Sequence, residues 1–353
     1  MQAETLDETR RQLQICNACR YCEGYCSAFP AITRLRDFSD GDITQIANLC
    51  HNCRGCYYAC QYTEPHEFAL NLPRALAEVR SGNWADYAWP APLARVFHKH
   101  AVATVIAAVT GFALILFVMR FLGEQSGPGF YALLSHTAMV AIFAPAFVLP
   151  LATVCVGLRR YWHDVGGQPI RAAHLRDALA QAAQMKNLKG GHGDGCNFEE
   201  GERFTHSRRR AHHAVMYGFL LCFASTASGT VLHYVFAMHA PYGLISLPKL
   251  FGLPGGILLT LGCVWLLMLR RRAAHDLSDT RTHGSDVAFL ALLGFVAASG
   301  LAVYASGGTA LSGPLLALHL GAVLSFFLLT PYTRMAHAFF RMAALVRDAQ
   351  QRL

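Results

Sequence analysis

Apolar residues are distributed unevenly along the chain. The first ninety or so positions are polar and hold eight of the twelve cysteines, whereas the rest alternates long apolar runs with basic loops. The run AVATVIAAVTGFALILFVMRFL, residues 101–122, is nearly free of charge. It is long enough to cross a hydrocarbon core of ~30 Å at ~1.5 Å per residue. The pattern therefore predicts a polar head followed by a membrane part.

Five further runs have the same character, each apolar over about twenty residues and bounded by Gly, Pro or charge. The six predicted spans are 101–122, 130–158, 211–237, 254–272, 285–306 and 313–338. The predicted fold class is all-α, with an alpha-helical ferredoxin-like head followed by a six-helix transmembrane bundle. The expected divisions are a head at 1–95, a membrane domain at 96–340 with a cytoplasmic loop at 159–210, and a cytoplasmic tail at 341–353.

Composition supports this division and argues against a nucleic-acid partner. The chain is 54% hydrophobic and only 15% charged, which is outside the usual range of soluble proteins. Its formal charge of +8 comes from Lys and Arg that cluster in loops beside apolar segments. We interpret this positive charge as a determinant of membrane topology, and expect the lipid bilayer as a partner.

The loop charges predict an orientation. The segment 159–210 carries ten Lys and Arg, and 270–284 carries four. The alternate loops at 121–129, 238–253 and 307–312 carry one Lys between them. The positive-inside rule then places both termini and the head in the cytoplasm. The sequence also begins without the apolar stretch of a secretory signal.

The head contains two copies of the pattern C-x2-C-x2-C-x3-C. The cysteines are Cys16, Cys19, Cys22 and Cys26 in the first run, and Cys50, Cys53, Cys56 and Cys60 in the second. Three thiolates at this spacing can hold three corners of a cubane, and the fourth usually reaches the other cluster. By that analogy, we expect one [4Fe–4S] cluster on the first three cysteines plus Cys60, and another on Cys50, Cys53 and Cys56 plus Cys26. A reducing cytoplasm disfavours disulfides, and a zinc site needs only two C-x2-C knuckles.

Histidines inside the spans are the next candidates, because ionisable side chains are costly in a membrane. His136, His233 and His319 lie near the outer ends of their spans and share one depth, at which they can face a haem. His213 and His337 lie near the cytoplasmic ends and form a second level, with His212 as a neighbouring substitute. One helix could carry both His319 and His337, because eighteen residues are five full turns. One or two haem b groups are predicted, although a histidine near a helix end is often only a snorkelling residue.

The long loop contains two features. Apolar positions at helical spacing in 169–189 predict a helix on the membrane surface. The glycine-rich segment 190–200 follows a helix and not a strand, so it does not match a dinucleotide-binding motif. It remains open whether this segment is a partner-docking surface, a flexible loop or a wall of the haem pocket, with Cys196 and His192 as weak ligand candidates.

The order of two cysteine runs, six spans and the loop GDGCNFEE at Gly193–Glu200 resembles the tricarballylate- or citrate-utilisation protein B family. The resemblance covers nearly the whole chain. It implies a protein of the bacterial inner membrane with [4Fe–4S] clusters and haem b. Such a protein reoxidises a cytoplasmic FAD-dependent dehydrogenase that converts tricarballylate to cis-aconitate, and delivers the electrons to membrane quinone.

Three other interpretations remain open. The same cofactors would serve a flavoprotein that oxidises a cobalamin precursor. The head could also be an iron–sulfur redox sensor anchored by an apolar bundle, although a mere anchor would not carry costly histidines. A transporter is disfavoured because no internal repeat with paired broken helices is evident.

Overall fold

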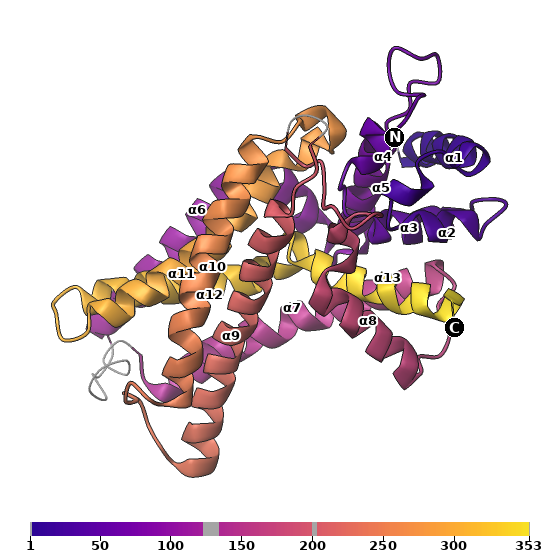
Figure 1. Cartoon of the computed structure of the whole chain (residues 1–353). Coiled ribbons are helices and arrows are strands. Elements are labelled where there is room, and N and C mark those ends of the chain that lie inside the picture. Colours follow the sequence, from indigo (N-terminus) through magenta and orange to yellow (C-terminus); the bar gives the residue numbers. More distant parts are fainter. Residues whose placement is uncertain (1, 123–133, 200–202, 353) are drawn as a thin grey trace.

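The computed structural model of the chain describes residues 2–122, 134–199 and 203–352. Its regular elements in these ranges are helices, and one isolated bridge pairs Cys196 with Thr205. Figure 1 shows a small helical head, which contains the N-terminus, at one end of a bundle of long helices. The predicted all-α fold class is confirmed.

Three helices build the head: α1 (Gln2–Cys19), α3 (Asp40–Leu49) and α5 (Leu72–Tyr87). Short helical turns connect them: η1 (Glu23–Tyr25), α2 (Phe29–Thr33) and α4 (Gly55–Tyr58). A capping box starts α3, because the Ser39 hydroxyl accepts from the Asp42 N–H and the Asp42 carboxylate accepts from the Ser39 N–H.

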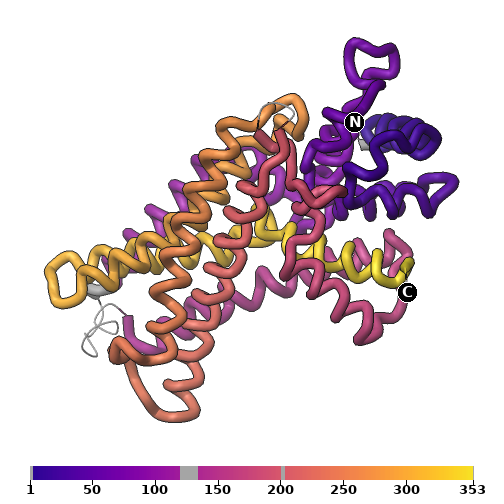
Figure 2. The backbone as a smooth tube through the Cα atoms, in the orientation of Figure 1, coloured from indigo at the N-terminus to yellow at the C-terminus, as the bar shows by residue number. Residues whose placement is uncertain are grey.

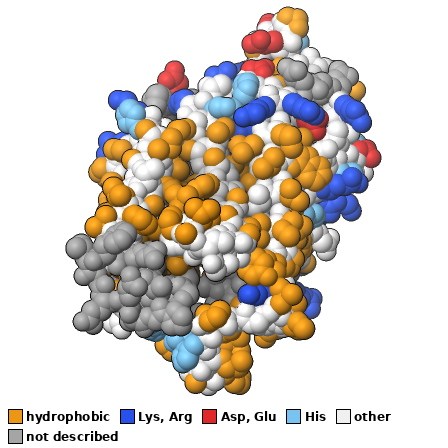
Figure 3. All heavy atoms as spheres, turned by 90° about the vertical axis from the view of Figure 1, so that its left-hand side faces the viewer, with side chains coloured by type: hydrophobic (Ala, Val, Ile, Leu, Met, Phe, Trp, Pro, Cys, Tyr) orange, Lys and Arg blue, Asp and Glu red, His pale blue; other side chains and the backbone are white. Residues whose placement is uncertain are grey.

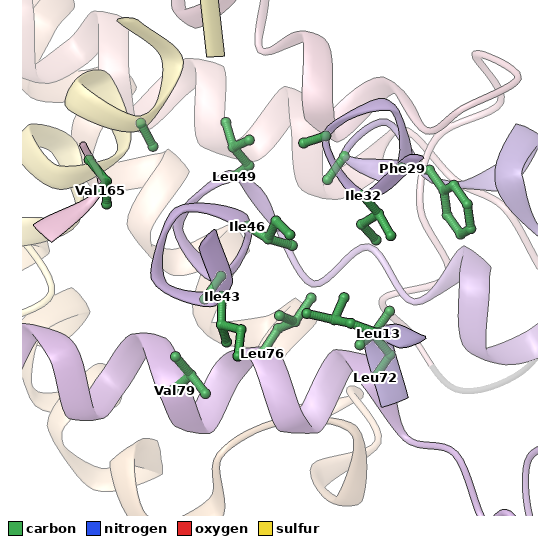
Figure 4. Close-up of a cluster of buried hydrophobic side chains, with 14 of the residues drawn as sticks. Leu13, Phe29, Ile32, Ile43, Ile46, Leu49, Leu72, Leu76, Val79 and Val165 are labelled. Carbon is green, nitrogen blue, oxygen red and sulfur yellow. The ribbon is translucent and has the colours of Figure 1, made fainter. Parts of the chain in front are cut away.

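The core of the head fixes the positions of the cysteine runs. Figure 4 shows Leu13 of α1, Ile43 and Ile46 of α3, and Leu76 and Val79 of α5 pointing toward one another, and all five are buried. The two cysteine runs begin at the ends of α1 and α3. Packing these helices side by side therefore brings the two runs together.

Within the described residues, six helices are long and apolar enough to cross a membrane, as predicted. They are α6 (Ala91–Leu122), α7 (His136–Asp164), α9 (Ser207–Phe236), α10 (Leu247–Arg271), α11 (His283–Ala305) and α12 (Ser312–Leu329). The α9–α10 hairpin is the most closely packed pair, and α12 lies against both α6 and α11. Apolar side chains spread across the middle of the face in Figure 3, as expected of a surface in contact with lipid. The part of the second predicted span before Leu134 lies outside the described residues.

The sixth predicted span, 313–338, is wrong at its end. Helix α12 stops at Leu329, a turn η6 (Thr330–Tyr332) follows, and α13 (Ala336–Arg352) is a separate helix. Pro331 lies in the turn, where it lacks the N–H that a continuing helix requires. The expectation that one helix carries both His319 and His337 is therefore also wrong.

Helix α13 belongs to the core of the head, although most of its length was expected to be a tail at 341–353. Phe340, Ala344 and Leu345 are buried in the same apolar cluster as Leu13. Along its side lies α8 (Ala172–Gln184), within the predicted surface helix 169–189, and a turn η3 (Lys186–Lys189) follows. The yellow C-terminal helix in Figure 2 thus runs back from the bundle into the head.

The remaining turns are η4 (His275–Leu277) and η5 (Thr280–Thr282), which connect α10 to α11. They face the head, because the Asn52 amide donates to the carbonyl of Leu277 at 2.9 Å. The second cysteine run therefore contacts the bundle directly.

Candidate functional site: two cysteine quartets and a histidine cavity

The first cysteine run coils around the end of α1. Its turn contains Arg20 in the left-handed region, with φ of 56°. Cys60 of the second run joins this group, since it is an electrostatic neighbour of both Cys16 and Cys22. Burial, and then the charges of Cys26 and Cys60, raise the pKa of the Cys22 thiol to about 12. The structure thus brings Cys60 to the first three cysteines.

The second run coils in the same way through two left-handed residues, Asn52 and Arg54, with φ of 51° and 68°. Cys26 joins it: the Cys56 thiol donates to the Cys26 sulfur, which raises the pKa of Cys56 and lowers that of Cys26. Cys26 is also the largest electrostatic influence on Cys53 after burial. Cys26 therefore lies beside the second run, which is compatible with an exchange of fourth cysteines as in ferredoxins.

Both groups offer the surroundings that iron-bound thiolates require. Backbone N–H groups point at sulfur, from Asn52 to Cys50 Sγ and from Tyr62 to Cys60 Sγ, each at 3.4 Å. Such hydrogen bonds and burial tune an iron–sulfur cluster. No set of three or more Cys, His, Asp or Glu side chains in the described ranges is arranged to hold a single metal ion.

The glycine-rich loop covers both cysteine runs. The N–H of Gly191 donates to the carbonyl of Tyr25 at 3.2 Å, and the N–H of Asn197 donates to that of Cys53 at 2.9 Å. The His192 ring packs edge-on against Tyr25, with ring centroids 4.7 Å apart. Cys196 is 1% exposed and contributes to the packing around Cys53. The loop, residues 191–197, therefore forms a lid over both cysteine runs.

A cavity of about 960 Å³ lies where the head meets the bundle. Five histidines line it: His51, His212, His275, His283 and His337. The rings of His212 and His337 lie with centroids 5.9 Å apart and planes at 84°. His213, the predicted partner of His337, instead packs beside Tyr217 and is not part of the cavity wall. His212, the neighbouring substitute, lines the cavity and His213 does not, because neighbours on a helix point about 100° apart.

Three of these five, His51, His212 and His337, have the features of metal ligands. His337 Nδ1–H donates to the carbonyl of Arg334, and His51 Nδ1–H donates to that of Leu49 at 2.9 Å. Metal-binding imidazoles are commonly oriented in this way, with the other nitrogen left for the metal. His212 Nδ1 is buried without a hydrogen-bond partner among the described residues. Burial, and then His212, hold the pKa of His337 well below its usual value, so the ring is neutral and can bind a metal.

The outer histidines form a different arrangement. The rings of His136 and His233 are stacked, with centroids 4.5 Å apart and planes at 10°, and His233 Nδ1 lies 3.0 Å from His239 Nδ1. Stacked rings this close do not face one iron from opposite sides. His319 Nδ1 lies 3.1 Å from the Ser299 hydroxyl of α11. The inner group therefore fits a haem better than the outer group does.

Comparison with known proteins places the chain in a family. Residues 90–353 match the family described as Citrate utilization protein B, and residues 9–88 match its Fer4-like domain. The chain belongs to the citrate utilization protein B family. A member from Escherichia coli, named Citrate utilization protein B, is 40% identical in an alignment 349 residues long that covers 97% of this chain and 91% of that relative. No solved structure matches.

The match confirms the resemblance drawn from the cysteine runs, the spans and the loop. The name of the Fer4-like domain in the citrate utilization protein B family supports an electron-transfer role for the head. The six apolar helices are compatible with a multi-pass membrane protein.

The sequence interpretation missed His51 and a group of arginines in the cavity. The missed signal is helical spacing, since Arg208 and His212 are four residues apart, as are His337 and Arg341. Residues at that spacing share a helix face. Arg80 and Arg341 both donate to the carbonyl of Cys50, at 2.8 and 2.9 Å. These arginines connect the second cysteine run to the histidine cavity.

Proposed function

We propose that this chain carries electrons from a cytoplasmic FAD-dependent dehydrogenase, by resemblance tricarballylate dehydrogenase, to membrane quinone. Two [4Fe–4S] clusters and haem b, when bound, supply the one-electron steps that connect a flavin to a quinone. We place the protein in the bacterial inner membrane with both termini in the cytoplasm, on the side of the basic segment 159–210.

The cysteine quartets are the proposed cluster ligands. One consists of Cys16, Cys19, Cys22 and Cys60, and the other of Cys50, Cys53, Cys56 and Cys26. Burial raises the pKa of the Cys16 and Cys53 thiols, and the negative charge of such buried sulfur is stabilised when thiolates bind a cationic iron core. Tyr21, beside Cys22, is 67% exposed, so the first quartet is the proposed entry point for electrons.

His212 and His337 are the proposed axial ligands of one haem. The other predicted histidines, His136, His233 and His319, stay proposed ligands of a second haem near the outer ends of the spans, whereas His213 is replaced by His212. The observation that carries the proposal is the contact between the two sites: Arg341 bonds the Cys50 carbonyl and lies one turn from His337 on α13. A short path therefore joins the second quartet to the inner histidines.

Spectroscopy of matched variants tests this proposal. We would purify the anaerobic full-length protein in detergent and measure visible and low-temperature EPR spectra before and after dithionite reduction. We expect b-type haem bands together with reduced-cluster signals. The neighbours His212 and His213 give the matched pair: His212→Ala should lose haem from the inner site, and His213→Ala should retain it.

Two results would contradict parts of the proposal. Clusters without any haem would favour the anchored redox sensor. Equal haem content in His212→Ala and the parent protein would remove His212 from the ligand set.

A further inference from the structure

The cavity wall carries far more positive than negative charge. Eight Lys and Arg side chains line it, but only two acidic ones, Asp279 and Asp286. Asp286 is paired with Arg270 and Arg334, and Asp279 is paired with Arg281, which is not part of the wall. The other six basic groups have no carboxylate partner among the described residues. Of these six, Arg54 and Arg80 are buried and Arg208 and Arg341 are half-buried, whereas Arg159 and Lys186 are exposed. Buried cations without a carboxylate partner favour an anionic ligand.

Three of the arginines carry unsatisfied hydrogen-bond donors. The Nε atoms of Arg80, Arg270 and Arg341 are buried and have no hydrogen-bond partner in the described part of the chain. Arg80 as a whole is only 2% exposed. Since a buried unsatisfied donor is costly, these atoms mark where a ligand acceptor would be favoured.

The arginines also surround the inner histidines. Arg208 lies one turn before His212 on α9, and Arg341 lies one turn after His337 on α13. The guanidinium groups of Arg80 and Arg334 lie over the Trp84 ring, 5.8 and 5.6 Å from its centroid. Trp84 in turn lies beside His337, with ring centroids 6.4 Å apart. The arginines and the candidate iron ligands therefore line the same cavity.

We propose that the arginines of this cavity bind the two propionate groups of the haem whose iron is held by His212 and His337. This inference rests on the proposed function, because it assumes haem at the inner histidines. The guanidinium fork matches a carboxylate with two parallel hydrogen bonds. Apolar side chains of α9 and α11, such as Phe219 and Leu293, line the same cavity and suit the body of the porphyrin.

The test compares haem with and without charged propionates. The full-length chain, produced without haem, is titrated with iron protoporphyrin IX and with its dimethyl ester, and the Soret band gives both dissociation constants. We expect the parent protein to bind the free acid at least tenfold more tightly than the ester. Arg80→Gln and Arg341→Gln should reduce that preference several-fold, and Arg341→Lys, which keeps the charge but loses the fork, should reduce it less.

Arg209→Gln is the matched control. Arg209 neighbours Arg208 on α9 but donates to the carbonyl of Gln184 and does not line the cavity. This variant should keep the preference of the parent protein.

The possible failures are distinguishable. Equal binding of acid and ester by the parent protein, with a six-coordinate spectrum that His212→Ala abolishes, would overturn the propionate site but leave the proposed haem intact. Binding of neither form would overturn both. Equal binding together with co-purified acidic lipid that Arg80→Gln releases would assign the arginines to a lipid phosphate, and would also overturn the propionate site.

Discussion

The two cysteine runs have the same spacing but lie in different surroundings. The first run has exposed Tyr21 beside it, and the Gln61 side-chain amide lies 3.8 Å from Cys19 Sγ. The second run is enclosed: Arg80 and Arg341 donate to the Cys50 carbonyl, and Arg208 donates to that of Asn52. Spacing selects the type of cluster, whereas nearby charge and exposure to water set its reduction potential.

This difference gives the electron path a direction. Nearby positive charge favours the more negative, reduced state of a cluster, so the second quartet should have the higher potential. Electrons that enter at the first quartet would then move toward the arginines and the inner histidines. The proposed order of electron transfer, from the first quartet to the second and then to the inner haem, follows from this difference in charge.

The largest expected difference comes from removing one ligand from each quartet. Cys56→Ala should lose one cluster and also weaken the contact between head and bundle, because buried Cys56 belongs to the run whose Cys50 carbonyl the arginines bind. Cys19→Ala should lose one cluster and leave the other intact. Iron, sulfide and haem per chain measure the result, with Cys56→Ala also losing haem.

Cys155→Ala is the control for cysteine removal, because Cys155 is exposed and outside both quartets. Identical losses in the two ligand variants, with haem retained in both, would show that the second quartet does not support the cavity.

Removing one arginine tests the asymmetry in potential. Arg208→Gln takes a positive charge away from the second run, to which it donates through the Asn52 carbonyl at 2.8 Å. The midpoint potential of the second cluster should fall by on the order of tens of millivolts, and that of the first should stay the same. An EPR-monitored redox titration measures both.

The neighbouring Arg209→Gln serves again as the control and should shift neither midpoint. If Arg208→Gln shifted both midpoints equally, the two clusters would share one electrostatic environment and the proposed direction would be lost.

Features with a long or strict sequence pattern could be predicted, and those set by a single residue could not. The cysteine runs and six apolar segments were visible because each repeats one simple requirement many times. The end of α12 was missed because Pro331 lies within an otherwise apolar stretch. The choice of His212 over His213 depends on the rotation of α9, which a one-residue difference changes by about 100°.

The arginine cavity was missed for another reason. Arg270 and Arg334 lie near span ends, where basic residues are expected to face the cytoplasm and set topology. Only the folded chain shows that both turn inward to Asp286, beside groups from α5 and α13. The docking of the glycine-rich loop was equally invisible, since its partners are more than a hundred residues away in the sequence.

The lid formed by the glycine-rich loop gives a further test of the difference between the two runs, with a smaller expected effect. A Cβ on Gly191 would lie 1.7 Å from the Gly24 carbonyl oxygen, so Gly191→Ala must displace the loop from the first run. The first cluster should then decay several-fold faster in air, as followed by absorbance. The second cluster should change less, because Asn197 still holds the loop at Cys53.

Gly193→Ala separates displacement from backbone strain. Gly193 has φ of +94°, but a Cβ there meets nothing within 4 Å, so the variant has only the conformational cost of a left-handed backbone, roughly 1–2 kcal/mol. Its clusters should decay at the parent rate. Faster decay of both clusters in both variants would mean that the lid protects the two quartets equally.

The smallest expected effect comes from the ion pair that ties the first-run side of the head to α13. Arg34, just after α2, pairs with Asp348, and both side chains are partly exposed. Asp348→Asn should therefore cost no more than about 1 kcal/mol of stability, because solvent screens such pairs. Asp286→Asn, on the second-run side, removes the buried carboxylate that the half-buried Arg270 and Arg334 share and should cost more, about 3 kcal/mol. Thermal unfolding in detergent measures the loss of stability in each variant. A larger loss in Asp348→Asn than in Asp286→Asn would contradict the prediction that the enclosed second-run side depends more on its ion pairs.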